Sequence, residues 1–308
     1  MTIDCGKVTV VVLNWRTPAH TIRAVRALVA DGVPAHRVVV VDNGSGDGSV
    51  QRLRSELSGT RVKALEKNTG FARGNNIGAA ALAGDAYLFV NSDAFVHARG
   101  SVGRLLAALD DPQVGLAVPR LLNADLSLQP NVFPAAAPLP ELVRASGLSR
   151  FVPNRFQPAI GSHWDHAESR AIQTATGGVI AARADLWELL GGFTEARFMY
   201  AEDLDLFWRT RELGRQARFV ADAEFIHLGN ASGEARWTDP GRAERIARAE
   251  AAMIRDHLPT IRGTLTLALM ALGVGGRAAF YRLRADHDRA AIMEGWLRGY
   301  RTGLRPPG

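Results

Sequence analysis

The sequence has a single cysteine, very little lysine and no apolar run long enough to span a membrane. Cys5 is the only cysteine in 308 residues, which excludes an internal disulfide and a cysteine-based zinc site and fits a reducing compartment. The apolar segment 264–274 is shorter than the roughly 20 residues that a spanning helix needs. Asp4 and Lys7 interrupt the start of the chain, so no secretory signal is expected there. These absences indicate a cytoplasmic protein.

Basic residues exceed acidic ones, but the excess is uneven along the chain. Three lysines accompany 34 arginines, and the net charge is +6. Residues 259–308 hold eight arginines and three acidic residues, a charge of +5, so the first 258 residues carry only +1. A nucleic-acid-binding protein usually has a basic face on its main domain. We therefore expect no nucleic-acid partner and a positively charged C-terminal segment.

Strand and helix patterns alternate over the first 120 residues. Hydrophobic residues make up 47% of the chain, an ordinary globular share. The alternation predicts an open, parallel α/β sheet, in which ligands bind at the carboxyl ends of the strands. Polar loops follow Val41 and Val90, at two of those ends. The expected strands are 8–13, 37–41, 62–65 and 87–90, and the expected helices are 21–30, 50–57 and 74–83.

Order is weaker in the middle of the chain. Residues 123–170 contain six prolines and little periodicity, which indicates an irregular excursion rather than a separate domain. Beyond it we expect strands at 176–182 and 218–220, helices at 184–190, 201–213 and 241–258, and a loop that holds His227. Segment 264–274 is expected to be a core helix or a helix at a membrane surface.

Two polar loops could contact a nucleotide. Asp42 and Asn43 precede Gly44, so a carboxylate there can accept hydrogen bonds from a base or ribose, although an ordinary turn has the same composition. The loop lacks the glycine spacing of a dinucleotide fingerprint, and the chain has no P-loop. Residues 68–76 bring Gly70, Arg73 and Asn75 to a helix start, where backbone N–H groups and Arg73 could hold a diphosphate. A capped loop is the simpler interpretation of that segment alone.

Two acidic segments could carry a metal and a general base. Asn91, Ser92 and Asp93 end a strand, and oxygen ligands of this kind suit Mg²⁺ or Mn²⁺ together with substrate phosphates; a capping turn is the alternative. Residues 202–205 place three acids in four positions at a helix start. Crowded carboxylates raise one another's pKa, which suits a general base, although the helix N-terminus by itself favours acids. Asp203 and Asp205 cannot face the same way on that helix.

The order and spacing of these segments resemble the inverting, non-processive family-2 glycosyltransferases of GT-A fold. The stretches that carry the resemblance are VVLNWRTP, VVVVDNGSGDGS, NTGFARGNN, LFVNSDA, TGGVIAARADLWELLGGFTEARFMYAEDLDLFWR and FIHLGNAS, between about residues 8 and 232. They are most similar to bacterial rhamnosyltransferase-like members that build cell-envelope glycans. The resemblance implies a GT-A, Rossmann-like, mostly parallel sheet flanked by helices, with a helical C-terminal appendage. The implied domains are 1–240, with a nucleotide-binding half to 120 and an acceptor and catalytic half after it, and a helical region 241–308.

The resemblance also implies a role for each matching residue. Asp203 corresponds to the catalytic base, beside Glu202. Asn91 replaces the first acid of the family's D-x-D metal motif, which removes one charge there. The implied nucleotide-sugar-binding residues are Asn14, Asp42, Asn43, Gly70, Arg73, Asn75, Asn91, Ser92 and Asp93; the metal ligands are Asp93 and His227; the acceptor-side residues are Gly177, Gly178, Asp205 and Trp208.

The function implied is an inverting, metal-dependent transfer of a sugar from a nucleoside diphosphate to a hydroxyl of a cell-envelope or lipid-linked glycan. Mg²⁺ or Mn²⁺ is the implied cofactor. Rhamnose from dTDP-rhamnose is the first candidate donor, and UDP- and GDP-linked sugars are alternatives. A sugar nucleotidyltransferase usually has a G-x-G-[ST]-R loop, which is absent, and an inactive binding module is a further alternative. The basic C-terminal region suits either contact with anionic lipids at the inner face of the cell membrane, or a helical cap or homodimer contact.

Overall fold

The computed structural model describes residues 3–304 except 162, 197–198 and 230–238. The chain forms two compact units. The first, called here the sheet unit, comprises Met1–Val132 and His166–Gly229; the second, the helical unit, comprises Phe133–Asp165 and Asn230–Gly308. This division differs from the one expected at residue 240. The proline-rich excursion belongs with the C-terminal helices, because its helix α5 (Pro138–Ala145) packs on α11 (Thr260–Leu283).

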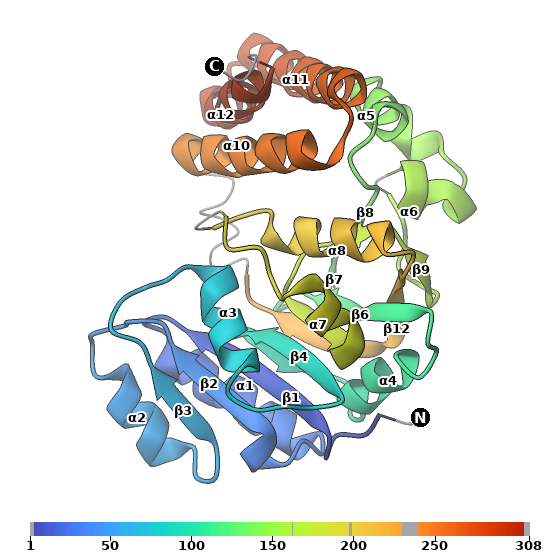
Figure 1. Cartoon of the computed structure of the whole chain (residues 1–308). Coiled ribbons are helices and arrows are strands. Elements are labelled where there is room, and N and C mark those ends of the chain that lie inside the picture. The colour runs from blue at the N-terminus through green and yellow to red at the C-terminus, as the bar shows by residue number, and fades with distance from the viewer. Residues whose placement is uncertain (1–2, 162, 197–198, 230–238, 305–308) are drawn as a thin grey trace. The chain divides into compact units, whose positions relative to one another are not determined.

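The sheet unit is built on a mostly parallel sheet, which confirms the expected fold class (Figure 1). The order of the main path is β3-β2-β1-β4-β11-β6-β12-β5. The first four of these strands are parallel, β11 is antiparallel to both of its neighbours, and β12 is again parallel to β6. The strands are β1 (Val8–Asn14), β2 (Val38–Asp42), β3 (Arg61–Ala64), β4 (Ala86–Asn91), β5 (Ala94–Val96), β6 (Val114–Leu122), β11 (Val179–Arg183) and β12 (Gln216–His227).

Helices cover both faces of this sheet, which is why β1 and β2 are almost continuous runs of buried valine. Helices α1 (Pro18–Ala30), α2 (Ser49–Glu56) and α4 (Ser101–Ala108) enclose the main hydrophobic core with one face of the strands. On the other face lie α3 (Phe71–Ala79) and α7 (Ala184–Leu190) (Figure 1). Helix α8 (Glu202–Glu212) packs on β12. Short strands β7 (Leu128–Gln129) and β9 (Arg170–Ile172) pair with β6 and β12.

Helix α3 lies very close to the sheet because small residues face the strands. A Cβ atom built on Gly78 would lie 2.4 Å from Val11 Cγ1, and one on Gly74 would lie 2.5 Å from Leu13 Cδ1. The helix begins at Phe71 rather than at residue 74, because Gly70 takes a positive φ and ends the preceding loop. Residues expected in a loop therefore stand on the first turns of a helix.

Strand β12 is much longer than the segment 218–220 expected from the sequence. It runs for 12 residues and pairs with β6 on one side and with β9 and β5 on the other. An irregularity in its register with β6, between Val220 and Glu224, interrupts the alternation of buried and exposed side chains that marks a strand in a sequence. His227 is consequently the last residue of a strand and not part of a loop.

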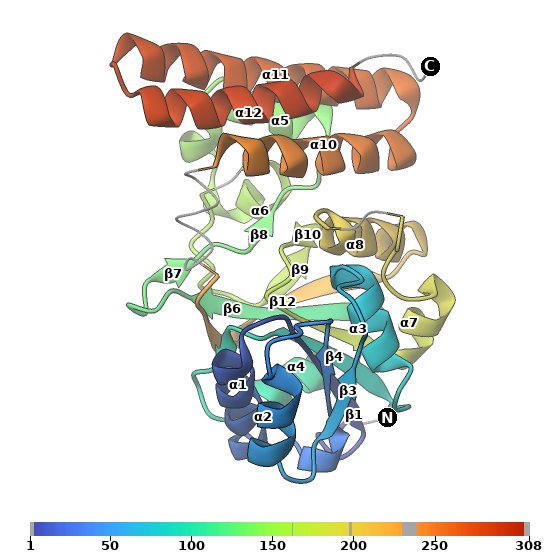
Figure 2. The same ribbon diagram turned by 90° about the vertical axis from the view of Figure 1, so that its left-hand side faces the viewer.

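Three long helices dominate the helical unit: α10 (Pro240–His257), α11 and α12 (His287–Gly303) (Figure 2). Helix α12 packs on both of the others. Gly295, Gly299 and Gly303 form one face of α12 and allow close approach to α10; a Cβ atom on Gly299 would lie 2.5 Å from Ala247 Cβ. Inside the unit, Tyr300 Oη donates a 2.7 Å hydrogen bond to Glu250 Oε2, and burial raises the pKa of this tyrosine.

Helix α11 extends well beyond the apolar segment 264–274 expected from the sequence. It has 24 residues, because the flanking glycines, alanines and arginines continue the helix to Leu283. The helix is long enough and apolar enough to cross a membrane, but the core helix of a soluble protein can have the same length and composition. In this structure α11 packs against α5 and α12, as a core helix does.

The close approach of α3 to the sheet predicts that Gly78→Ala lowers the free energy of unfolding by about 1–3 kcal/mol, because the added methyl group overpacks the core against Val11. Gly103→Ala on α4 is the matched control, since nothing lies within 4 Å of a Cβ atom there and alanine favours the helix. Chemical denaturation measures both. Equal stability of the two variants would contradict the close packing.

Candidate functional site

Polar side chains meet where adjacent parallel strands end. The register pairs Asn14 on β1 with Asp42 on β2, and Leu13 on β1 with Asn91 on β4. Asn14, Asp42 and Asn91 therefore stand side by side at one edge of the sheet, although up to 77 positions separate them in the sequence. This is the carboxyl edge at which ligands bind in such sheets.

Asp42 is more enclosed than the sequence led us to expect. Its Oδ2 accepts hydrogen bonds from Asn14 Nδ2 at 2.7 Å and from Ser45 Oγ at 2.6 Å, and its Oδ1 accepts one from Ser45 N at 3.1 Å. Asp42 is 1% exposed and Asn14 is fully buried. These donors occupy three of the roughly four acceptor positions of a carboxylate, so little of Asp42 remains for a base or ribose. Ser45, which the sequence analysis did not single out, is the centre of the cluster.

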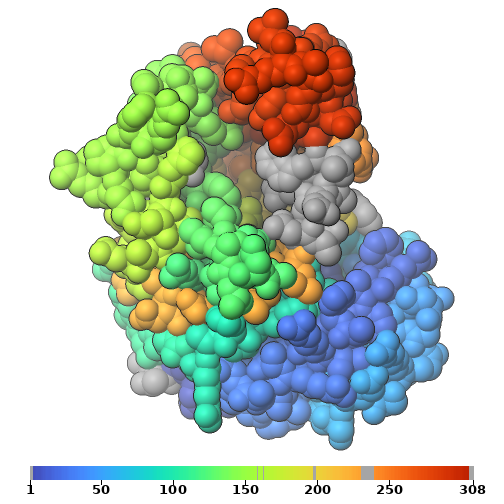
Figure 3. Space-filling model, turned by 180° about the vertical axis from the view of Figure 1, so that it is seen from behind, coloured from blue at the N-terminus to red at the C-terminus, as the bar shows by residue number. Residues whose placement is uncertain are grey.

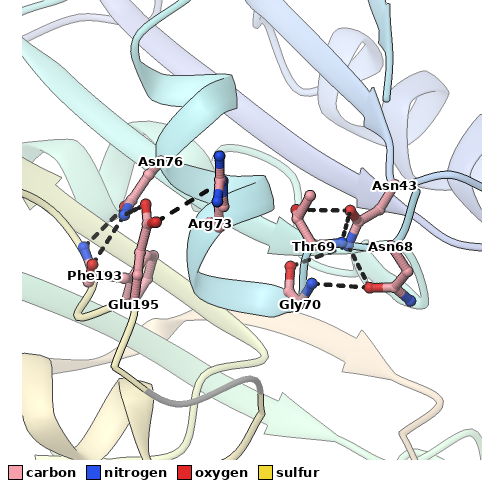
Figure 4. A network of polar contacts seen from close by, with 8 residues as sticks. All are labelled: Asn43, Asn68, Thr69, Gly70, Arg73, Asn76, Phe193 and Glu195. Carbon is pink, nitrogen blue, oxygen red and sulfur yellow. Dashed lines mark hydrogen bonds and ion pairs between the residues drawn. The ribbon is translucent and has the colours of Figure 1, made fainter. Parts of the chain in front are cut away.

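Asn43 ties the loop after β2 to the loop before α3 (Figure 4). Its Nδ2 donates to Asn68 Oδ1 and to the carbonyl of Gly70, and its Oδ1 accepts from the backbone N–H of Thr69. Asn43 is 2% exposed, so its side chain supports the two loops rather than presenting a free amide to a ligand.

A pocket of about 420 Å³ opens beside Asp42, between the loop 44–49 and Leu65. Asp47 and Glu66 also line it. Side chains of this charge suit the N–H groups of a base or the hydroxyls of a ribose, and they disfavour phosphate. The pocket can therefore receive the base end of a nucleotide.

Helix α3 presents Arg73 to solvent (Figure 4), whereas the side chain of Asn75 on the same helix is buried. The Arg73 side chain is 62% exposed, and its Nε lies 4.0 Å from Glu195 Oε2. Asn75 is 1% exposed and donates to the carbonyl of Phe71 within the helix, so it does not face a ligand as expected. Asn76, which the sequence analysis did not assign, bonds both the N–H and the C=O of Phe193 and so anchors the loop after α7.

The three candidate metal-motif residues and His227 lie together. His227 Nε2 lies 3.4 Å from Asp93 Oδ1 and 3.3 Å from Asn91 Nδ2, and Ser92 Oγ is 3.1 Å from Thr17 Oγ1. Strand β12 brings His227 here because it pairs with β5, in which Ala94 is opposite His227. The structure thus joins residues that are 134 positions apart in the sequence.

His227 also controls the charge of Asp93. Burial by itself would raise the pKa of the Asp93 carboxyl, but the hydrogen bond and charge of His227, when its ring carries both protons, outweigh it and hold this pKa below its usual value. The carboxylate therefore remains ionised down to a lower pH than an ordinary aspartate. An ionised oxygen ligand beside a histidine is suited to binding a divalent cation.

Gln129 on β7 orients the imidazole. Its Nε2 donates to the carbonyl of His227 at 3.1 Å and to Asn123 Oδ1 at 2.9 Å, which fixes the amide so that Oε1 faces the ring. His227 Nδ1 then donates to Gln129 Oε1 at 2.7 Å. In the neutral ring Nε2 is then an acceptor, and it lies 3.4 Å from a second acceptor, Asp93 Oδ1. A proton or a cation between these two atoms would stabilise the pair.

The residues present fit a hard divalent cation whose coordination the substrate completes. Asp93 and His227 supply one oxygen and one nitrogen, and Asn91 would add an amide oxygen if its side-chain amide, whose Nδ2 faces His227 here, were turned over. Among the described residues no group of three or more histidine, cysteine or acidic side chains could hold a metal by itself. Such a sparse set is typical of sites that share Mg²⁺ or Mn²⁺ with a diphosphate.

Gly177 and Gly178 connect this pair to the candidate base. The N–H of Gly177 donates a 2.7 Å hydrogen bond to Asp203 Oδ2. The carbonyl of Gly178 accepts from the backbone N–H of Asn91, and a Cβ atom on Gly178 would lie 3.3 Å from the His227 ring. A Cβ atom on Gly177 would lie 3.2 Å from Asp203 Cβ, again closer than ordinary van der Waals contact. The two glycines therefore let Asp203, Asn91 and His227 lie in one site.

Backbone strain precedes the acidic segment of α8. Tyr200 and Ala201 both take positive φ values, 78° and 66°, immediately before Glu202. Conformations of this kind cost on the order of 1–3 kcal/mol each and persist where the surrounding structure requires them, often at functional sites. They turn the chain so that α8 begins with Glu202, which is buried, and Asp203, which is half-buried.

Asp205 and Trp208 are both buried on α8. Asp205 is 4% exposed and accepts a 2.7 Å hydrogen bond from Arg209 Nε. Arg209 also donates to the carbonyls of Leu190 and Gly192, so this pair fastens α8 to the end of α7. Trp208 is 8% exposed. Asp203 and Asp205 bond to different partners, Gly177 and Arg209, so they face different ways. The acceptor-side role of Asp205 and Trp208 stays a prediction.

Part of the sequence matches a known protein family. Residues 9–141 match the family described as Glycosyl transferase family 2. That segment, which is less than half of the chain, is therefore similar to family-2 glycosyltransferases. A relative from Mycobacterium tuberculosis, N-acetylglucosaminyl-diphospho-decaprenol L-rhamnosyltransferase, is 30% identical over 205 residues, which cover 62% of this chain. The chain spans 66% of the length of that relative, slightly less than two thirds.

Solved structures show the same GT-A fold. A mannosyltransferase, PcManGT from Pyrobaculum calidifontis, in complex with GDP-Man and Mn²⁺, superposes with a TM-score of 0.57 at 17% identity, over 98% of this chain and 87% of that one. S. aureus TarS 1–349 in complex with UDP gives a TM-score of 0.52 at 16% identity, over 96% and 92% of the two chains. At these identities the likeness shows the fold alone.

The Gln129 contact predicts the tautomer of His227 in the metal-free protein. Nitrogen-15 NMR of the neutral imidazole should find the proton on Nδ1. Gln129→Leu removes the acceptor, so the proton should shift to Nε2. Gln129→Glu retains an acceptor and should keep the wild-type pattern. An unchanged spectrum in the leucine variant would show that Gln129 does not set the tautomer.

Proposed function

We propose that this protein is an inverting glycosyltransferase that moves a sugar from a nucleoside diphosphate to an acceptor hydroxyl. The observation that carries the proposal is the Gly177–Gly178 connection. It holds the Asp203 carboxylate on one side and the Asp93–His227 pair on the other. A general base and a cation-binding pair in one site are the two parts that a single displacement on a nucleotide-sugar needs.

Asp203 is the proposed base. Its carboxylate takes the proton of an acceptor hydroxyl while the hydroxyl oxygen bonds to the anomeric carbon from the face opposite the phosphate. The bond between that carbon and the phosphate oxygen breaks, and the diphosphate leaves with the electron pair. One displacement inverts the anomeric configuration. The hydrogen bond from the Gly177 N–H keeps the carboxylate oriented toward the reacting hydroxyl.

Charge on the leaving diphosphate is balanced from two directions. Arg73 is exposed at the start of α3 and can bind a phosphate by paired hydrogen bonds. Asp93 and His227, with Asn91, would hold Mg²⁺ or Mn²⁺, which when bound supplies positive charge to the diphosphate. The pocket beside Asp42 is the proposed position of the donor's nucleobase.

For the donor we propose dTDP-rhamnose, with UDP- and GDP-linked sugars as alternatives, and for the acceptor a lipid-linked cell-envelope glycan. The name of the Mycobacterium tuberculosis relative, a rhamnosyltransferase acting on a diphospho-decaprenol lipid, supports this choice. Such an acceptor places the protein in the cytoplasm at the inner face of the cell membrane. A thermal-shift panel of the three nucleotide-sugar classes with and without Mn²⁺ ranks the donors.

Asp203→Asn is predicted to lower kcat by about 10²- to 10⁴-fold, because the amide cannot accept the acceptor's proton. Donor affinity, measured by calorimetry, should stay within about threefold, since Asp203 contacts the acceptor side of the reaction. Asp222→Asn is the control, because Asp222 is an exposed carboxylate on the same sheet unit. Near-normal turnover by the Asp203 variant would reject the proposed base, and no release of nucleoside diphosphate by the wild type would favour an inactive binding module.

Asp93→Asn is predicted to remove most of the Mn²⁺ dependence of nucleotide binding. In the wild type, Mn²⁺ should tighten binding of the nucleoside diphosphate, and the variant should lose at least about tenfold of that gain because one charged ligand is gone. Calorimetric titration of dTDP and UDP, with Mn²⁺ and with a chelator, measures the difference. An unchanged titration with Mn²⁺ present would contradict a metal role for Asp93.

A further inference from the structure

The helical unit carries the whole net charge of the protein. By composition, the sheet unit has 21 basic and 21 acidic residues and is neutral. The helical unit has 16 basic residues, all arginine, and 10 acidic ones, a net charge of +6. The catalytic unit does not need this charge, so its concentration on the other unit points to a separate anionic partner.

One face of α11 is exposed and apolar along the whole helix. Ile261 is 84% exposed, Leu272 67% and Leu283 88%. The residues between them at spacings of three or four belong to the same exposed face, and none of them is charged. We call this face the apolar stripe; it consists of Ile261, Leu265, Ala268, Leu272, Gly276, Ala279 and Leu283.

The opposite face of α11 is occupied by the protein itself. Thr266, Leu267, Met270 and Val274 are buried against the rest of the helical unit. A soluble core helix buries its apolar face and exposes polar residues, whereas α11 is apolar on both faces. Figure 3 shows part of the surface of these C-terminal helices, in orange to red, and of the segment 133–165, in green. A contiguous exposed apolar face of this length marks a binding surface.

Arginines and aromatic rings lie at the C-terminal end of the stripe. A pocket of about 730 Å³ is lined by Ala279 and Leu283 of the stripe together with Arg282, Arg298 and Arg301. Arg282 and Arg298 pair with Glu294 and Glu244, whereas Arg301 is exposed and completes the cationic rim. The Arg284 guanidinium lies over the half-exposed Phe280 ring at 4.7 Å. Apolar surface that ends in guanidinium groups matches an acyl chain that ends in a phosphate.

We propose that the apolar stripe lies in the plane of a bilayer that contains anionic lipids, with the arginine-lined pocket at its end receiving a lipid phosphate. From residue 261 to residue 283 the stripe is roughly 33 Å long, a suitable length for a helix on a membrane surface. A second copy of this chain is a poorer occupant, because each helical unit carries +6. A spanning orientation would require the buried face of α11 to leave α12 and α5.

This inference goes beyond the proposed glycosyl transfer and does not depend on it. The test therefore uses the full chain without donor, in flotation with vesicles of phosphatidylcholine alone or mixed with phosphatidylglycerol. The wild type should float with the mixed vesicles and remain in solution with phosphatidylcholine alone, because the unit's charge contributes to binding.

The decisive variant is the double substitution Leu272→Glu and Leu283→Glu, which places charge on the stripe and removes no buried side chain. Its matched control is Leu189→Glu with Leu213→Glu, which changes two exposed leucines of the sheet unit and alters the net charge equally. The stripe variant should bind the mixed vesicles at least about tenfold more weakly than the control. Circular dichroism checks the fold, and Leu272→Ser is the milder second variant should the double substitution unfold.

Several outcomes would overturn the inference. They are absence of wild-type flotation, equal flotation of the stripe variant and its control, or a stable dimer that the stripe variant abolishes while vesicle binding is unchanged. Saturable binding of inorganic phosphate that Arg301→Gln removes, without any vesicle binding, would assign the pocket to a free anion instead of a lipid. Donor hydrolysis by the same variants reports separately on the transferase proposal.

Discussion

The site depends on the close approach of backbone to side chains at Gly177 and Gly178. With no Cβ at either position, the chain just before β11 can lie against the Asp203 carboxylate at Gly177 and against the His227 ring at Gly178. The same strand is antiparallel to β4, so the Gly178 carbonyl also fixes Asn91. Asp93 and His227 meet because β12 pairs with β5, and the two glycines add Asp203 to the same site.

Around that contact the chain supports each functional group with a second residue. Gln129 fixes the His227 ring, His227 keeps Asp93 ionised, and Ser45 and Asn43 hold the loops at the base pocket. Each support comes from a different element. A reaction that needs groups held to within a fraction of an ångström benefits from such support, because disorder in any one group reduces the probability of a productive arrangement.

The two units differ in net charge and in the surface that they expose. The sheet unit is neutral overall and holds the candidate chemistry, while the helical unit carries the net positive charge and the apolar stripe. Close packing of α12 on α10 through glycine leaves α11 as the helix whose second face is uncovered. A lipid-linked acceptor cannot leave the membrane surface, so a catalytic unit that works on it gains from an attachment of this kind.

The sequence by itself determined the parallel strands, the polar residues at their ends and the order of the motifs, because valine runs and strand-end loops are local signals. It did not determine which polar residues are exposed: Asp42, Asn75 and Asp205 are enclosed by partners that only folding brings near. It also missed Gln129, whose partner His227 lies 98 positions away, and the full length of β12, which an irregular register hides. These features depend on long-range contacts, and only the tertiary structure decides those.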